Sequence, residues 1–360
     1  MMAKIQFVCP GCGRVLQCDE RDRGHKIKCP HCKYHLLIPK LLRPAGSRQP
    51  RGARIRTLLL AGIAVLAVAV VVAVISIAFP MQLHWPDRRP IGILFLASNY
   101  HASATNPRGW FNDPGQNFTG PDGPQRFRQA LFDYTDQSLA ILKRINAQGV
   151  IVWDVEGEQF PHKITYIGDP RLVGTLAPEM APVVDEFFAR LTNAGLRVGV
   201  TIRPQQFVFG DHAQSPQQDV VNLKRILLEK IDYARAHWGA TIFYVDSNGG
   251  IRRPDEAWQM RRLAAQRPDV LLIPEHSDPL YRAFSAPYVS LRQSVPGTNA
   301  GFAQTFFPRS FQALDISDAA DRLTAIEAAR ARGDVLLCRA WYWNPECQLL
   351  ENFAQAQTNH

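Results

Sequence analysis

The longest apolar run in the chain, residues 58–79, constrains its fold more than any other feature. The run reads LLLAGIAVLAVAVVVAVISIAF and contains no charged residue. About twenty such residues, in a helix that rises roughly 1.5 Å per residue, are long enough to cross the hydrocarbon of a bilayer. A buried core helix is seldom apolar on every face for so long, and a signal peptide would begin closer to the N-terminus. The run therefore predicts a single transmembrane helix.

The charged residues on either side of this run predict its orientation. Lys40 and five arginines precede it with no acid after Lys40, whereas Asp87 follows it beside two further arginines. Because positive residues stay on the cytoplasmic side, we expect a single-pass protein of the cell membrane with a cytoplasmic N-terminus and an extracytoplasmic C-terminal domain. The predicted domains are an N-terminal module at 1–40, a basic linker at 41–57, the span at 58–79 and a large domain at 80–360.

The net charge of +9 is distributed unevenly along the chain. Residues 1–56 carry 13 Lys and Arg against 3 Asp and Glu, and the remaining residues carry 28 against 29. A basic protein often binds nucleic acid, but here the basic character belongs to the small N-terminal part. The large domain is close to neutral, which gives no electrostatic reason to expect a polyanion partner there.

Four cysteines near the N-terminus have the spacing of a metal site. Cys9 and Cys12 form one C-x-x-C pair, Cys29 and Cys32 form another, and sixteen residues separate the pairs. Four thiolates so arranged can surround one Zn²⁺ tetrahedrally as a closed structural site. The C-P-G-C-G sequence resembles the zinc-ribbon family, which implies a small β-hairpin fold that depends on its metal. Four further residues are interpreted as loop or strand residues beside this site: Cys18, His25, His31 and His35.

The sequence leaves the partner of this ribbon open. Its basic field, continued by the arginine-rich linker, suits RNA, DNA, anionic lipid head groups or a protein. The lipid interpretation is favoured for the linker, because bases beside a membrane lie within a Debye length of its surface. Specific recognition of nucleic acid would require more than scattered Lys and Arg.

The large domain alternates short apolar runs with helix-period segments, as a (β/α)₈ barrel does. An open doubly wound sheet is the alternative, although no glycine-rich phosphate loop follows the first strand. The predicted strands are Ile91–Ala97, Gly149–Asp154, Arg197–Arg203, Ala240–Asp246, Val270–Pro274, Tyr288–Leu291, Phe311–Asp315 and Val335–Arg339. The predicted helices are Arg128–Ala147, Met180–Ala194, Asp219–His237, Asp255–Arg267 and Ser317–Arg332, with a short turn near Asp278–Phe284.

Polar and aromatic residues collect where these strands end, which is where barrels place their chemistry. Carboxylates outnumber the other types, and neither a histidine cluster with metal spacing nor a G-x-S-x-G elbow is present, so zinc hydrolysis and serine acyl transfer are disfavoured. The residues expected to contact a substrate are Asn99, His101, Trp153, Asp154, Glu156, Arg203, Asn248, His276, Asp315, Arg339, Trp341 and Trp343. Asp246 and Glu275 are the expected catalytic pair.

Paired carboxylates beside flat aromatic rings suit the cleavage of glycosidic bonds. On these strand-end residues the domain resembles the TIM-barrel glycoside hydrolases, in which an Asp ending the fourth strand is the nucleophile and a Glu ending the fifth is the acid/base. Asp246 and Glu275 match those places, and Asp315 matches a third carboxylate of amylase-like barrels. Tyr244 departs from the pattern, because amylase-like enzymes carry Arg two residues before the nucleophile. The acids at 154–158 offer a competing pair.

The sequence thus predicts a membrane-anchored, exported glycoside hydrolase of the retaining kind, with zinc in the ribbon and no cofactor in the barrel. The alternative is a catalytically silent domain that binds or senses carbohydrate and is coupled to a cytoplasmic zinc ribbon. Separation of the two carboxyl groups discriminates between these possibilities, because a retaining enzyme requires them to lie close together.

Overall fold

The computed structural model describes residues 4–38, 83–113, 115–159, 166–208, 217–248, 255–276, 278–293, 307 and 309–358. The chain divides into two compact units. The first unit contains the cysteine pairs and the second contains the alternating domain, and each is described by itself.

The N-terminal unit consists of two short antiparallel hairpins. Strand β1 (Lys4–Val8) pairs with β2 (Val15–Asp19), and β3 (Lys26–Lys28) pairs with β4 (His35–Leu37). A 3-10 turn, η1 (Glu20–Asp22), follows β2. The turn of each hairpin carries one C-x-x-C pair, and the small core contains two of the cysteines with Leu16 and Leu36. So few buried side chains stabilise a fold of this size poorly without a further contribution.

The second unit is built on a sheet of eight parallel strands. Most of the strands are short runs of buried apolar residues, which is typical of a parallel sheet covered on both faces, whereas β12 is half-buried. In chain order they are β5 (Ile91–Phe95), β6 (Gly149–Trp153), β7 (Arg197–Ile202), β10 (Ile242–Val245), β11 (Leu271–Pro274), β12 (Tyr288–Ser290), β13 (Ala313–Asp315) and β14 (Val335–Arg339). A small hairpin follows β7 and consists of β8 (Gln206–Phe207) and β9 (Gln217–Gln218).

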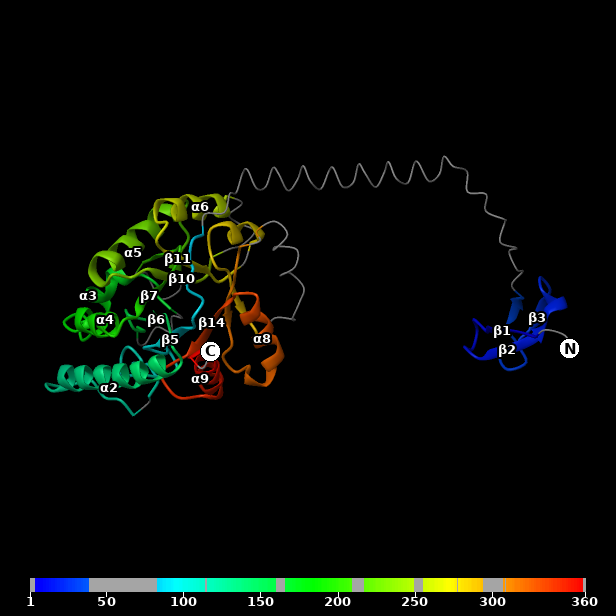
Figure 1. Cartoon of the computed structure of the whole chain (residues 1–360), viewed down its shortest axis with the longest axis horizontal. Helices are drawn as coiled ribbons and strands as arrows, with labels where there is room; N and C mark the ends of the chain where they lie inside the picture. The colour runs from blue at the N-terminus through cyan, green and yellow to red at the C-terminus, as the bar shows by residue number, and fades with distance from the viewer. Residues whose placement is uncertain are drawn as a thin grey trace. The chain divides into compact units, whose positions relative to one another are not determined.

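The order of these strands around the sheet follows the chain, as it does in a (β/α)₈ barrel. The first strand, β5, pairs with the last strand, β14, and in Figure 1 the two lie side by side. The two ends of the sheet are β11 and β12, where the Ala286 N–H donates to the Leu272 carbonyl oxygen at 2.9 Å. The predicted eight-stranded α/β barrel is therefore confirmed, with a seam between its fifth and sixth strands.

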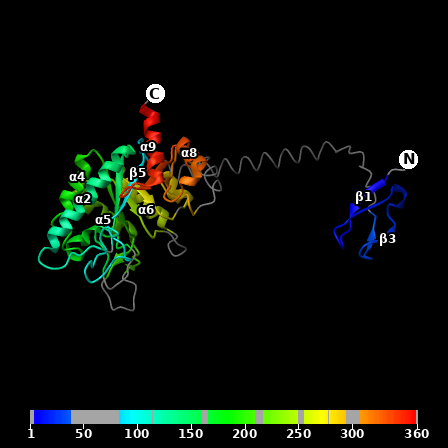
Figure 2. The same ribbon diagram turned by 90° about the horizontal axis from the view of Figure 1, so that it is seen from below.

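Helices cover the outside of this sheet (Figures 1 and 2). They are amphipathic: in α4, for example, Phe187 and Phe188 are buried while the charged residues are not. The α-helices are α2 (Gly123–Arg144), α3 (Val173–Leu176), α4 (Val184–Asn193), α5 (Leu223–Trp238), α6 (Glu256–Gln266), α8 (Leu323–Ala331) and α9 (Pro345–Thr358). Three 3-10 turns are η2 (Pro170–Leu172), η3 (Pro279–Ala283) and η4 (Ala320–Arg322). The sequence prediction did not include α9.

Two apolar cores lie on the two faces of the sheet. The larger core lies between strands and helices, and the smaller one contains the alternate residues of the strands, such as Ile93, Ile151 and Ile273. Because side chains alternate along a strand, these alternate residues fill the barrel interior. The same alternation makes the residues at the carboxyl ends of the strands the upper layer of the interior.

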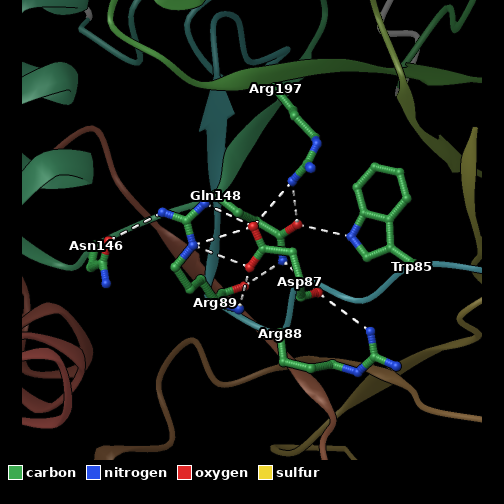
Figure 3. A network of polar contacts seen from close by, with 7 residues as sticks. All are labelled: Trp85, Asp87, Arg88, Arg89, Asn146, Gln148 and Arg197. Atoms are coloured by element: carbon green, nitrogen blue, oxygen red, sulfur yellow. Dashed lines mark hydrogen bonds and ion pairs between the residues drawn. The ribbon is translucent and has the colours of Figure 1, made fainter. Parts of the chain in front are cut away.

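The segment that enters the first strand closes the amino-terminal end of the barrel (Figure 3). The Trp85 ring belongs to the interior core, and its Nε1–H donates to Gln148 Oε1 at 2.8 Å. The Gln148 amide donates in turn to the carbonyl oxygens of Asp87 and Arg89. Arg197 contacts both Gln148 and the Asp87 carboxylate. Each polar side chain in this network therefore has a partner.

The described residues do not support the predicted membrane helix. None of the helices that the structure describes is long and apolar enough to cross a bilayer, and the predicted span, 58–79, lies outside the described residues. The structure therefore gives no support to the single-pass localisation in the cell membrane, to the orientation derived from it or to the membrane as a partner.

Candidate active site

The carboxyl ends of three neighbouring strands bring Arg203, Asp246 and Glu275 together. Strands β7, β10 and β11 are neighbours, and each of these residues directly follows its strand. The backbone continues the pairing, because the Asp246 N–H donates to the Ile202 carbonyl at 2.9 Å and the Glu275 N–H to the Val245 carbonyl at 3.0 Å. The three side chains therefore start at one level of the barrel.

Asp246 is buried and paired with Arg203. The Arg203 Nε–H donates to Asp246 Oδ2, and the Ser247 hydroxyl lies 3.4 Å from the same oxygen. Burial raises the pKa of Asp246 to about 6; Arg203 opposes the rise, and the charge of Glu275 and a hydrogen bond with it add to it. The two carboxyl groups thus lie at neighbouring strand ends beside one guanidinium, and the charge of Glu275 disfavours ionisation of Asp246.

Glu275 is more open to solvent than Asp246. Its side chain is 31 % exposed, and Oε2 accepts a hydrogen bond of 2.8 Å from the Ser247 N–H. The His276 Nε2 lies 3.6 Å from the same oxygen. A partly exposed carboxyl group on the strand next to that of a buried carboxylate is placed to exchange protons with a ligand and with water.

Arg203 supplies the cation that the sequence pattern lacks at position 244. Tyr244 points into the barrel interior and lies over Trp153, with ring centroids 4.7 Å apart. The guanidinium beside Asp246 instead comes from the end of β7, where it also lies 5.9 Å from the Tyr166 ring centroid. The charge partner of Asp246 therefore comes from the neighbouring strand.

Three acids follow β6, and they face different surroundings. Asp154 has a left-handed backbone, with φ of 59°, and neither of its carboxyl oxygens has a hydrogen-bond partner although only 3 % of the residue is exposed. Burial first, and then Glu158 and Glu156, hold the pKa of Asp154 well above its usual range. Burial raises the pKa of Glu158 to about 8 and that of Glu156 to about 7. Asp154 and Glu158 both lie near Arg203, whereas Glu156 lies near Asp169.

A buried lysine holds the loop that follows β7. The Lys230 Nζ donates to the carbonyl oxygens of Gly168, Arg203 and Gln205 at 3.0, 2.8 and 2.8 Å, and lies 3.5 Å from an Asp169 oxygen. These contacts fix the backbone from which the Arg203 side chain extends. No signal in the sequence distinguishes Lys230 from the exposed lysines of an amphipathic helix.

Two other predicted contact residues are used within the protein. Asn248 is 1 % exposed; its amide donates to the His276 carbonyl oxygen and accepts from the His276 N–H, so it ties two strand ends together. Asp315 accepts from the Tyr288 hydroxyl at 2.8 Å and from the Ser317 N–H at 2.9 Å, as a residue that begins a turn does. His276 itself keeps a side chain that is 62 % exposed.

The predicted aromatic residues separate into rim and surface positions. Trp153 is buried in the barrel interior, and the Trp341 ring lies edge-on to Phe95 at 5.3 Å. Trp343 is not part of this group, because it stacks against the Arg144 guanidinium at 3.6 Å on the outer side, where it joins the helix-facing core. Arg339 is ion-paired with Asp318 at 2.9 Å. Asn99 and His101 lie, partly exposed, in the turn after β5.

The cysteines of the N-terminal unit form a second candidate site. The Cys9 and Cys32 sulfurs lie 3.7 Å apart, the Cys12 and Cys29 sulfurs 3.8 Å apart, and all four within 4.8 Å of one another. Such a group can hold a metal ion such as zinc. Among the described residues, this is the one group of three or more His, Cys, Asp or Glu side chains with such spacing, and the histidines of the unit lie outside it.

Comparison with known proteins gives weak structural likenesses. No family model and no curated protein matches the chain. It is similar to a maltogenic alpha-amylase of Thermotoga neapolitana, at 15 % identity and with a TM-score of 0.38. The match covers 64 % of this chain and 59 % of the amylase chain. It is similar to an alpha-fucosidase of Thermotoga maritima at 11 % identity over 76 % of this chain and 73 % of the fucosidase chain, with a TM-score of 0.42. It is similar to an alpha-amylase of Geobacillus thermoleovorans at 10 % identity over 73 % of this chain and 77 % of the amylase chain, with a TM-score of 0.44. Because these values are low, the barrel assignment rests on the strand pairing.

Proposed function

We propose that the barrel is a glycoside hydrolase that uses Asp246 as nucleophile and Glu275 as acid/base. The observation that supports it is the position of these two carboxyl groups at the ends of the adjacent strands β10 and β11, beside the Arg203 guanidinium. Double displacement requires carboxyl groups about 5 Å apart, whereas inversion requires a wider gap for a water molecule. Carboxyl groups that extend from the ends of two neighbouring strands favour the retaining reaction.

The two environments give the two carboxyl groups different roles. Arg203 stabilises the ionised form of Asp246, which attacks the anomeric carbon while the bond to the leaving oxygen breaks. Glu275, at the open side of the pair, gives its proton to that oxygen and then takes a proton from the water that releases the sugar. Because the pKa of Asp246 is about 6, turnover falls as the pH drops below that value and the nucleophile becomes protonated.

The test measures turnover of dinitrophenyl α- and β-glycosides of glucose, galactose, mannose and fucose by the full chain. Replacing Asp246 by Ala lowers turnover on the order of 10³-fold or more, and added azide restores it as a glycosyl azide. Glu275→Gln loses least on these dinitrophenyl glycosides, whose leaving group needs no proton, and loses roughly 10²–10⁴-fold on the corresponding methyl glycosides, whose leaving group does. The exposed Asp136→Asn on α2 is the matched control and keeps full turnover.

Two results would remove this assignment. Full turnover in the Asp246→Ala variant would show that Asp246 is not the nucleophile. Binding of sugars by the native chain without turnover of any glycoside supports the alternative, a catalytically silent carbohydrate-binding domain.

For the N-terminal unit we infer a zinc ribbon in which Cys9, Cys12, Cys29 and Cys32 hold one structural Zn²⁺. Four soft anionic ligands without an open position suit zinc, and the small core gives the unit a reason to depend on it. Metal analysis of the full chain should give about one zinc per chain for the native protein and for the Cys18→Ser control. Cys29→Ser should lose the metal and the hairpin signals in NMR, and zinc retained in that variant contradicts the site.

A further inference from the structure

A cavity opens at the end of the barrel where the strands, like those that carry the acid pair, reach their carboxyl ends. Its volume is about 370 Å³, and it lies where strands β12, β13 and β14 end, so it is separate from the three strand ends that carry the acid pair. Arg339 and Tyr342 lie on one side of it, and Arg292 and Asp321 lie on another. Cavities of this size accommodate small ligands or single units of larger ones.

The charges around this cavity are already compensated. Arg339 is paired with Asp318 at 2.9 Å and Arg292 with Asp321 at 3.4 Å. Glu346 accepts hydrogen bonds from two backbone N–H groups, at 3.0 and 3.1 Å. Among the described lining residues, three acids therefore face two bases, and both bases have a carboxylate partner. An anionic ligand gains little there, whereas the exposed parts of the ion pairs offer donors and acceptors to neutral hydroxyl groups.

A row of aromatic rings connects this cavity with the strand that carries Asp246. Tyr244 lies 4.7 Å from Trp153, Trp153 lies 5.1 Å from Phe95, and Phe95 lies 5.3 Å from Trp341, all between ring centroids. The last step, from Trp341 to Tyr342, is again 5.3 Å. Exposure rises along the row from 5 % at Tyr244 to 43 % at Tyr342. The ring that reaches the cavity is therefore the one that is open to a ligand.

We propose that this cavity binds a neutral sugar residue of an extended glycan, with the Tyr342 ring as its stacking platform. The inference rests on the proposed action of the barrel on carbohydrate, and it adds that the substrate is a chain of neutral sugars. The cleaved residue lies between Asp246 and Glu275, and a residue further along the chain stacks on Tyr342 while the ion pairs bind its hydroxyl groups. The cavity is thus an outer subsite that selects long substrates over short ones.

The experiment measures binding without turnover. The full chain carrying Asp246→Asn is titrated by calorimetry with maltotetraose, cellotetraose and mannotetraose. At least one of them binds, and Tyr342→Ala in the same background weakens that binding about tenfold, whereas Tyr342→Phe, which keeps the ring, restores it. Trp258→Ala is the matched control, because Trp258 is as exposed as Tyr342 but lies on α6. The control leaves the binding constant unchanged.

The outcomes separate this subsite from the proposed hydrolase. Equal tetrasaccharide binding in Tyr342→Ala and its parent, or no binding of any tetrasaccharide, overturns the subsite, whether or not the native chain cleaves aryl glycosides. Binding that depends on Tyr342 in a protein that cleaves no glycoside overturns the hydrolase and leaves the subsite in place.

Discussion

The two ends of the barrel differ in how a carboxyl group is hydrogen-bonded. At the amino-terminal end, Asp87 accepts hydrogen bonds from the Arg89 side chain and backbone and from Arg197 (Figure 3). At the carboxyl-terminal end, Asp154 is buried with no hydrogen-bond partner for either oxygen. Burial would raise the pKa of Asp87, but the bonds from its two arginines outweigh burial and lower it; burial raises the pKa of Asp154 unopposed by any hydrogen bond.

The difference indicates which end is organised for stability and which for a ligand. A buried polar group without a partner costs free energy, so a fold keeps one only where another requirement imposes it. The left-handed backbone of Asp154 adds to that cost. In barrels, the amino-terminal end contributes stability and the carboxyl-terminal end contributes chemistry. The contrast between Asp87 and Asp154 is what this division predicts.

The largest expected effect tests the amino-terminal end. Replacing Trp85 by Ala removes a ring from the interior core and the shorter of the two hydrogen bonds that Gln148 Oε1 accepts. We expect the free energy of unfolding to fall by about 3–5 kcal/mol, as for other buried aromatic residues. Urea denaturation of the full chain, followed by circular dichroism, measures the change.

The control for this loss is Trp258→Ala on the outer face of α6, where the side chain is 42 % exposed. We expect it to change the free energy of unfolding by less than about 1 kcal/mol. Similar losses in the two variants would mean that Trp85 does not close the barrel, and the assignment of the amino-terminal end to stability would fail.

The second effect tests the carboxyl-terminal end. Asp154→Asn keeps the volume and tolerates the positive φ, but it removes the ionisable group. Because the pKa of Asp154 is raised in the folded state, the folded protein holds a proton that the unfolded chain releases above about pH 4, and native stability falls as the pH rises. We therefore expect the variant to be more stable than the native protein by about 1–3 kcal/mol at pH 8 and equal to it near pH 4.

Denaturation curves at a series of pH values from 4 to about 8 check this prediction. The exposed Asp136→Asn should follow the native curve throughout. If Asp154→Asn is less stable than the native protein at pH 8, Asp154 contributes to stability after all, and the contrast between the two ends disappears.

Much of the barrel could be predicted from the sequence, because its strands are buried on both faces and appear as short apolar runs. Gly195 and Gly239, both with positive φ, end the helices α4 and α5 where the pattern placed those ends. Helix α9 was missed although it follows the eighth strand, where the alternation of a (β/α)₈ barrel predicts a helix. The membrane span was inferred from hydropathy alone; it lies outside the described residues, and none of the described helices is long and apolar enough to cross a bilayer.

The sequence could predict the positions only of those site residues that directly follow a strand. Arg203, Asp246 and Glu275 come together because neighbouring parallel strands end at one level. The direction of the chain beyond a strand is set by local backbone geometry, so the sequence did not show that Trp343 turns outward while Tyr342 lines a cavity. The burial of Lys230 is a tertiary property of the loop that it holds, which helix periodicity does not show.

The smallest expected effect compares the two carboxyl groups directly. Because the folded-state pKa of Asp87 is lowered, its ionised form contributes stability above the unfolded pKa of about 3.9, and that contribution is lost as the pH falls. Asp87→Asn should therefore cost about 1 kcal/mol at pH 7 and nothing at low pH; the arginine partners are 45 % and 44 % exposed, so solvent screening keeps the value small. We compare the free energy of unfolding of each variant minus that of the native protein. With rising pH this difference should become more negative for Asp87→Asn and more positive for Asp154→Asn. Slopes of the same sign would show that both ends hold their carboxyl groups alike.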